Sequence, residues 1–136
     1  MQLKDYILNV NKKFRNFFFS GIAFDSTKVK KNDIFFAIKG NKFNGNNFIK
    51  NAIKKGSKII VTEEKNKKLQ DKATFIYTKN ARKLLAEVSY KIYRDKPKNL
   101  IAVTGTNGKS SIADFYFKIL NLSKKRVASI GTLGVK

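Results

Sequence analysis

The sequence contains no cysteine and no histidine. Without cysteine the chain can form neither a disulfide nor a thiolate metal site. Without histidine it lacks the side chain that most often acts as a general base or a metal ligand. Any chemistry that this chain performs must therefore rest on lysine, carboxylate, hydroxyl and backbone groups.

Long hydrophobic runs are also missing, since no apolar run approaches the roughly 18 residues of a membrane-spanning helix. The densest aromatic run, Phe17 to Phe19, is followed by Ser20 and Gly21, and it predicts a core strand. At the start of the chain Lys4 and Asp5 precede any apolar stretch, without the apolar core of a signal peptide. These features predict a cytoplasmic protein with no membrane partner.

Acidic residues are scarce, because 9 Asp and Glu stand against 30 Lys and Arg and give a formal net charge of +21. This charge raises the hypothesis of a nucleic-acid-binding module, since phosphate neutralisation gives affinity for any sequence. The lysines are, however, spread over every predicted element. Lys, Asn, Ile and Phe make up nearly half of the chain and all have A/T-rich codons. Genome composition explains this mixture at least as well as a polyanion partner, so we expect a solvated surface and no specific nucleic acid.

The hydrophobic pattern predicts alternating strands and helices, which indicates α/β layers. Expected strands cover residues 21–26, 34–38, 58–62, 74–77, 100–103 and 126–130. Expected helices cover 3–14, 47–56 with Asn47 as a cap, 80–93 with Asn80 as a cap and an end before Pro97, and a segment after residue 111. In the turn before the second strand, Asn32 is expected in a left-handed conformation.

A glycine loop separates the apolar segment 100–103 from the last predicted helix. It consists of Gly105, Thr106, Asn107, Gly108, Lys109, Ser110 and Ser111. Glycines let backbone amides close around phosphate oxygens, a helix N-terminus adds a positive dipole end, and Lys109 adds a full charge. Ser110 stands where a P-loop places the hydroxyl that helps to hold Mg²⁺. The loop therefore predicts a nucleoside triphosphate site.

The match to the general P-loop pattern is incomplete, because Val103 stands where the first glycine would fall. An ordinary strand-to-helix turn is the bland alternative. The loop argues against an ordinary turn, because it holds two glycines, a lysine and two serine or threonine hydroxyls within a few positions. A P-loop motor or switch protein, in which hydrolysis drives motion, is another alternative.

Five groups of residues between Gly21 and Gly134 share one pattern with a known enzyme family. They are Asp25-Ser26 with Val29, Asp33, Phe35, Ala37 and Gly40; Gly45 with Phe48, Ile49, Ala52 and Gly56; Asn80-Ala81-Arg82; Thr104 to Ser110; and Ile130-Gly131-Thr132-Leu133-Gly134. In this pattern the chain resembles the Mur ligases of peptidoglycan synthesis. It is most similar to the members that add a diamino acid as the third residue of the stem peptide, while the ligases that add D-Ala-D-Ala are the alternative within the family.

The resemblance implies an α/β fold in two parts. Residues 1–79 would form a small α/β domain that binds the UDP part of the substrate, and residues 80–136 would form the first strand, loop, helix and strand of a P-loop ATPase domain. The implied activity is ATP-dependent amide ligation by a protein that is monomeric when full length. The D-glutamyl carboxylate of a UDP-N-acetylmuramoyl-dipeptide attacks the γ-phosphate of ATP, and the amine of meso-diaminopimelate or L-lysine then displaces phosphate from the acyl phosphate.

The resemblance also implies roles for individual residues. Residues 105–111 would bind ATP, with Lys109 as the catalytic group on the β- and γ-phosphates and Ser110 on Mg²⁺. The UDP part would be held by Phe24, Ser26, Asn41, Lys42 and Phe43. These five also have structural interpretations, such as a core position for Phe24 and a turn cap for Ser26.

The sequence departs from the family pattern at several positions. Thr27 stands where Arg is usual, Asn32 where Gly is common, and Asn44 and Asn46 where Asp and His are frequent. Family members also continue for several hundred residues beyond the position of Lys136, with the acidic Mg²⁺ ligands, a carbamylated lysine and the amino-acid-selecting motif. We therefore expect a truncated ligase that has an uncovered sheet edge and no catalytic turnover.

Overall fold

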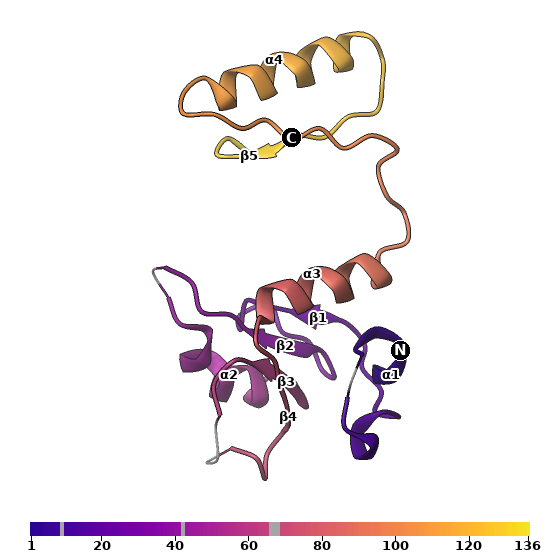
Figure 1. Ribbon diagram of the computed structural model, residues 1–136, viewed down its shortest axis with the longest axis vertical. Helices are drawn as coiled ribbons and strands as arrows, with labels where there is room; N and C mark the ends of the chain where they lie inside the picture. Colours follow the sequence, from indigo (N-terminus) through magenta and orange to yellow (C-terminus); the bar gives the residue numbers. More distant parts are fainter. Residues whose placement is uncertain (9, 42, 66–68) are drawn as a thin grey trace. The chain divides into compact units, whose positions relative to one another are not determined.

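The computed structural model describes residues 1–8, 10–41, 43–65 and 69–136, and it divides the chain into residues 1–95 and residues 96–136 (Figure 1). The first unit contains α1 (Leu3–Tyr6), the 3₁₀ turn η1 (Lys12–Phe14), β1 (Ile22–Ala23), β2 (Ile34–Ala37), the 3₁₀ turn η2 (Gly45–Phe48), α2 (Ile49–Lys54), β3 (Ile59–Thr62), β4 (Thr74–Tyr77) and α3 (Ala81–Ile92). The second unit contains α4 (Lys109–Leu122), β5 (Ile130–Gly131) and β6 (Gly134–Val135).

A four-stranded parallel sheet with the order β1-β2-β3-β4 lies at the centre of the first unit. Strands β2 and β3 are buried along their whole length, as expected when helices cover both faces of a parallel sheet. The strands predicted over 34–38, 58–62 and 74–77 are confirmed, and with them the α/β class.

Alternate side chains of each strand enter two separate cores, one on each face of the sheet. On one face Ile34 and Phe36 join a cluster that includes Val88 of α3. On the other face Phe35 joins a cluster that includes Ala52 of α2. Figure 1 shows α2 and α3 on opposite sides of the sheet. The sheet is thus sandwiched, and the segments that follow its strands are held at one edge.

Two local predictions of the first unit are confirmed. The Asn80 side chain caps α3 by accepting a hydrogen bond from the Lys83 amide at 2.8 Å, and the helix ends at Ile92, before Pro97. Asn32 has a φ of 65°, the left-handed conformation expected of it.

The N-terminal segment differs from the long helix predicted over residues 3–14. Helix α1 ends at Tyr6, and Ile7 has an extended backbone. The chain folds back at this point, so that the Leu3 amide donates to the Phe17 carbonyl at 2.9 Å. The core strand predicted for Phe17 to Phe19 is also wrong, because Phe18 is 69% exposed and only Phe19 is buried. The Leu3 and Lys4 amides, which a helix of any length starting there would leave without an internal acceptor, donate to the Phe17 and Arg15 carbonyls.

The helix predicted after Asn47 begins with a 3₁₀ turn. Asn44 caps this turn by accepting a hydrogen bond from the Asn46 amide at 3.0 Å, so the prediction of Asn47 as the cap is wrong. Helix α2 follows directly from Ile49.

Helix α3 belongs to the first unit, because it buries Ala81 and Val88 in the core beside the sheet. The division between compact units therefore falls after Asp95. The functional domain boundary expected between residues 79 and 80 stays a prediction.

The second unit consists of α4 and the antiparallel β5–β6 hairpin. The strand predicted at 126–130 is reduced to Ile130–Gly131, and residues 100–103 form no strand. A strand requires a hydrogen-bonded neighbour, and within residues 96–136 the sheet contains only β5 and β6. Across all the described residues, no helix is both long and apolar enough to cross a bilayer.

Candidate functional site

The glycine loop enters α4 through two positions that require glycine. Gly108 is the N-cap of α4 with a φ of 74°, and Gly105 has a φ of 147°. Residues that carry a side chain rarely adopt these backbone conformations. A Cβ at Gly108 would meet no atom within 4 Å, so the backbone conformation, and not crowding, is what demands glycine there. The loop residues 104–111 are all exposed.

The Lys109 side chain folds back over this loop. Its ammonium donates hydrogen bonds to the carbonyl oxygen of Gly105 and, at 3.0 Å, to that of Thr106. An ammonium has three N–H donors, so these two contacts leave one. The positive charge is thereby held over the turn that sequence analysis predicted to bind a triphosphate.

The first turn of α4 points its amide groups toward the same loop. The Ile112 amide donates to the Gly108 carbonyl at 2.9 Å and makes the first bond of the helix. The amides of Lys109, Ser110 and Ser111 precede it and have no acceptor within the helix. Together with the dipole end and the Lys109 charge, they form a local geometry that suits an anion with several oxygens.

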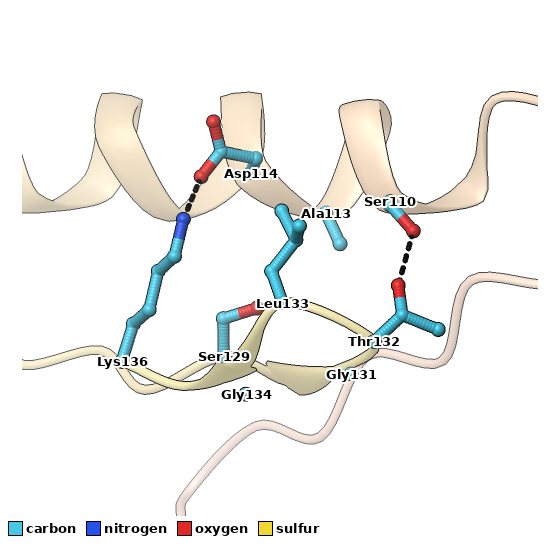
Figure 2. Close-up of a pocket in the computed structure, with 9 residues that line it drawn as sticks. All are labelled: Ser110, Ala113, Asp114, Ser129, Gly131, Thr132, Leu133, Gly134 and Lys136. Carbon is cyan, nitrogen blue, oxygen red and sulfur yellow. Dashed lines mark hydrogen bonds and ion pairs between the residues drawn. The ribbon is translucent and has the colours of Figure 1, made fainter.

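A cluster of polar side chains joins α4 to the β5–β6 hairpin (Figure 2). The Ser110 and Thr132 hydroxyl oxygens lie 2.8 Å apart. One helical turn later, the Asp114 carboxylate binds the ammonium groups of Lys118 at 2.7 Å and Lys136 at 2.5 Å. Hydrogen bonds from Lys118 and then from Lys136 hold the pKa of Asp114 below its usual value of 3.8.

Sequence reasoning did not predict this cluster. Asp114 is the only acidic side chain among residues 96–136, and it lies four residues after Ser110. That spacing places both on one helix face and was a usable signal. Two lysines bind the Asp114 carboxylate. On this face of α4 the Ser110 hydroxyl oxygen is therefore the better candidate for a cation ligand.

The residues predicted to hold UDP follow β1 and β2, which are neighbouring parallel strands. Phe24 is 69% exposed and Phe43 is 72% exposed, so Phe24 is not a core residue. Asn41 is also exposed, and Lys42 lies outside the described residues. Parallel strands place such loops at their common carboxyl edge, where ligands of open α/β sheets bind.

Ser26 is buried, and its hydroxyl accepts a hydrogen bond from the Asn51 side chain at 3.1 Å. The turn itself is made by Asp25, whose carboxylate accepts from the Thr27 hydroxyl at 2.7 Å and the Thr27 amide at 2.8 Å. These bonds, from the side chain first, lower the pKa of Asp25 from its usual 3.8. Ser26 is therefore tied to α2, whereas Phe24 faces solvent.

A lysine from another element contacts Thr27, the residue that stands where the family pattern usually has arginine. The Lys55 ammonium, from the end of α2, donates to the carbonyl oxygen of Thr27. It also contributes to the lowered pKa of Asp25 through its charge. The sequence could not reveal this contact, because residues 27 and 55 are distant in the chain.

A hydrogen-bonded network fixes the loops that follow β2 and β3. The buried Thr62 hydroxyl donates to the Asn46 side chain at 2.6 Å and accepts from the Glu64 amide at 3.1 Å. The Asn44 side chain donates to the Glu64 carboxylate at 3.3 Å. Asn44 and Asn46, which depart from the family pattern, are thus structural elements of this edge.

Comparison with known proteins is consistent with this architecture. The family model described as the Mur ligase family, catalytic domain, matches residues 19–94. A curated relative from Rickettsia prowazekii (strain Madrid E), named UDP-N-acetylmuramoyl-L-alanyl-D-glutamate--2,6-diaminopimelate ligase, is 43% identical over 128 residues, which cover 94% of this chain and 26% of the relative. A relative of the same name from Clostridium tetani (strain Massachusetts / E88) is 44% identical over 117 residues, covering 82% of this chain and 24% of its own length.

Two solved structures share the fold. A structure titled UDP-N-acetylmuramoyl-L-alanyl-D-glutamate--2,6-diaminopimelate ligase matches with a TM-score of 0.77 and 23% identity, covering 100% of this chain and 28% of that one. The MurF ligase from Thermotoga maritima in complex with ADP matches with a TM-score of 0.57 and 24% identity, covering 74% of this chain and 23% of that one. The chain thus spans about a quarter of the length of the curated relatives it matches. Because the family model covers more than half of its residues, the chain belongs to the Mur ligase family.

Proposed function

We propose that this chain supplies the UDP-substrate-binding domain and the ATP phosphate loop of a cytoplasmic, monomeric ligase of peptidoglycan precursor synthesis. The full reaction joins 2,6-diaminopimelate to the D-glutamyl carboxylate of UDP-N-acetylmuramoyl-L-alanyl-D-glutamate at the expense of ATP. The names of relatives that are 41–44% identical support this choice of amino acid over L-lysine and over D-Ala-D-Ala. The observation that carries the proposal is the Lys109 ammonium, which is folded over the Gly105–Gly108 turn at the start of α4.

The loop residues fit ATP and Mg²⁺ by their donor and acceptor groups. Lys109 and the first amides of α4 would bind phosphate oxygens, and the Ser110 hydroxyl would offer an oxygen to Mg²⁺, a cation that prefers oxygen ligands. ATP supplies the phosphoryl group that activates a carboxylate, which is otherwise a poor acyl donor. The chain's own contribution is to hold the β- and γ-phosphates while Lys109 offsets the negative charge that develops during transfer.

The carboxyl edge of the sheet suits the nucleotide part of the substrate. Phe24 and Phe43 present exposed aromatic faces on which a uracil base could stack, a contact worth roughly 1–3 kcal/mol per base. Lys55 provides a cation next to the β1 turn, and Asn41 provides an amide after β2. Lys42 belongs to the same proposal through its position in the sequence alone.

The test is calorimetric titration of the chain with Mg²⁺–ATP, comparing Lys109→Ala with Lys98→Ala. Both variants lose one positive charge from an exposed site in the second unit. Loss of a charged hydrogen-bond donor costs about 1.5–3 kcal/mol. At about 1.4 kcal/mol per factor of ten, Lys109→Ala should weaken binding roughly 10- to 150-fold. Lys98→Ala should change it less than about twofold, within the effect of an exposed, salt-screened charge.

Two further titrations separate the alternatives. A general polyanion site would lose affinity for single-stranded DNA equally in Lys109→Ala and Lys98→Ala, with a steep salt dependence. A P-loop motor or switch protein would bind ATP but not UDP-N-acetylmuramoyl-L-alanyl-D-glutamate. Equal ATP affinity of the unsubstituted chain and Lys109→Ala would contradict the proposal.

A further inference from the structure

The Gly-Thr-Leu-Gly motif of residues 131–134 has no part in the function proposed so far. The structure places its threonine at the two-residue turn between β5 and β6. The Thr132 hydroxyl oxygen lies 2.8 Å from that of Ser110, at the first turn of α4 (Figure 2). A motif distant in sequence thus contacts Ser110, the loop residue whose hydroxyl is proposed above to bind Mg²⁺.

This contact is one of two polar side-chain contacts between the hairpin and α4. The second is the ion pair between Lys136 and Asp114, at 2.5 Å. Ser110 and Asp114 are one helical turn apart on the same face of α4. Lys136 is in turn paired with Ser129 across the hairpin through two backbone hydrogen bonds of 3.0 and 3.1 Å. The ion pair therefore fixes the hairpin at a second point and limits how far Thr132 can move from Ser110.

Resting on the proposed function, we propose that Thr132 is a positioning residue that orients the Ser110 hydroxyl for the cation bound with ATP. A hydroxyl has one proton to donate and two lone pairs. If Ser110 directs a lone pair to a cation, its proton must be accepted elsewhere. The Thr132 oxygen stands at hydrogen-bond distance and accepts that proton, which fixes the Ser110 rotamer. Acceptors of this kind behind a metal ligand commonly tune metal affinity.

Threonine is better suited to this role than serine would be. Its branched Cβ restricts rotation of the hydroxyl. Leu133, the other turn residue, points toward α4 beside Ala113 and keeps the turn against the helix (Figure 2). The Thr132 oxygen is therefore held near Ser110 by both its own rotamer and the turn that carries it.

The experiment measures ATP affinity with Mg²⁺ and, separately, with EDTA, for four variants of the chain. Thr132→Val removes the hydroxyl at nearly constant volume, and Thr132→Ser restores it. Ser129→Ala is the matched control, because it removes a hydroxyl from the same hairpin and leaves the backbone pairing with Lys136 intact. Lys109→Ala reports on the phosphate site itself.

We expect Thr132→Val to weaken Mg²⁺–ATP binding about tenfold, the lower end of typical effects behind a metal ligand. Its affinity for ATP in EDTA should stay within about twofold of the unsubstituted chain, because the amides and Lys109 are untouched, whereas Lys109→Ala should lose affinity under both conditions. Thr132→Ser should recover most of the Mg²⁺ dependence, and Ser129→Ala should retain all of it.

Two results would overturn the assignment while leaving the proposed function in place. One is unchanged Mg²⁺–ATP affinity in Thr132→Val. The other is an equal loss with and without Mg²⁺, which would indicate a general distortion of the loop. If the unsubstituted chain binds no ATP, the proposed function fails and this inference fails with it.

Discussion

Phe24 and Phe36 are the same residue type in the same unit, but the structure places their side chains in opposite environments. Phe36 is fully buried in β2, in the cluster that contains Val88. Phe24 follows β1 and is 69% exposed. Replacement of each by alanine should therefore separate stability from substrate binding.

The expected effect on stability follows from burial. Truncation of a fully buried phenylalanine costs about 3–5 kcal/mol, through lost transfer free energy and the cavity that remains. An exposed position usually changes stability by less than about 0.5 kcal/mol. Phe36→Ala should therefore lower the free energy of unfolding by several kcal/mol, while Phe24→Ala should leave it nearly unchanged.

The expected effect on binding is reversed. If a uracil base stacks on Phe24, its loss should cost about 1–3 kcal/mol. At about 1.4 kcal/mol per factor of ten, affinity for UDP-N-acetylmuramoyl-L-alanyl-D-glutamate should fall roughly 5- to 150-fold. Phe36 is buried within the sheet and cannot contact the substrate. Under conditions in which the Phe36→Ala variant is folded, its affinity for the substrate should therefore be unchanged.

Urea unfolding followed by circular dichroism measures the first effect, and calorimetric titration measures the second. Phe18→Ala is the matched control, because Phe18 is 69% exposed like Phe24 but lies beside the N-terminus and away from the carboxyl edge of the sheet. It should change neither quantity. Unchanged substrate affinity in Phe24→Ala, or equal losses in Phe24→Ala and Phe18→Ala, would refute the placement of the uridine at this edge.

Three further predictions concern local structure. Asn80→Ala should destabilise the first unit by about 1 kcal/mol in urea unfolding, since it removes the cap on the Lys83 amide. Gly45→Ala should cost about 1–3 kcal/mol in the same assay, because its Cβ would lie 2.6 Å from the Ile38 nitrogen, a backbone atom. Folding lowers the pKa of the Asp25 carboxyl below 3.8, so the ionised carboxylate should stabilise the folded state above that pH, and this stabilisation should be lost as pH falls through the folded pKa. Asp25→Asn should therefore flatten the pH dependence of the free energy of unfolding.

Sequence reasoning succeeded where one local signal and one burial requirement agreed. The apolar and aromatic run predicted as a strand over 74–77 coincides with β4, and Asn80 directly precedes a helical pattern that it caps. It failed where distant backbone decided the outcome. Nothing local indicates that residues 15–17 pair with the N-terminus and end the first helix at Tyr6.

The candidate site shows the same division. The left-handed conformation of Gly108 and the contact of Lys109 with the loop involve residues close together in the sequence, so local reasoning could reach them, while their role in phosphate binding stays a prediction. Thr132 and Lys55 were not predicted as contacts, since each meets its partner across more than 20 residues of chain. The prediction of a strand at 100–103 is wrong. It was based on apolar residues, and apolar composition does not supply the neighbouring strand that hydrogen bonding requires.

Helix α4 of the second unit has little burial. None of the α4 residues is buried, and Ile112, Phe115 and Ile119 are 56%, 64% and 61% exposed. A helix of this length is marginal in water without tertiary packing. The contacts of Ser110 with Thr132 and of Asp114 with Lys136 join α4 to the hairpin, but exposed polar contacts of this kind contribute only about 0–1 kcal/mol each. A ligand that binds only the folded loop adds its binding free energy to this small balance. If the loop binds phosphate as proposed, phosphate binding and the stability of α4 are coupled, and Mg²⁺–ATP should raise the free energy of unfolding of the second unit.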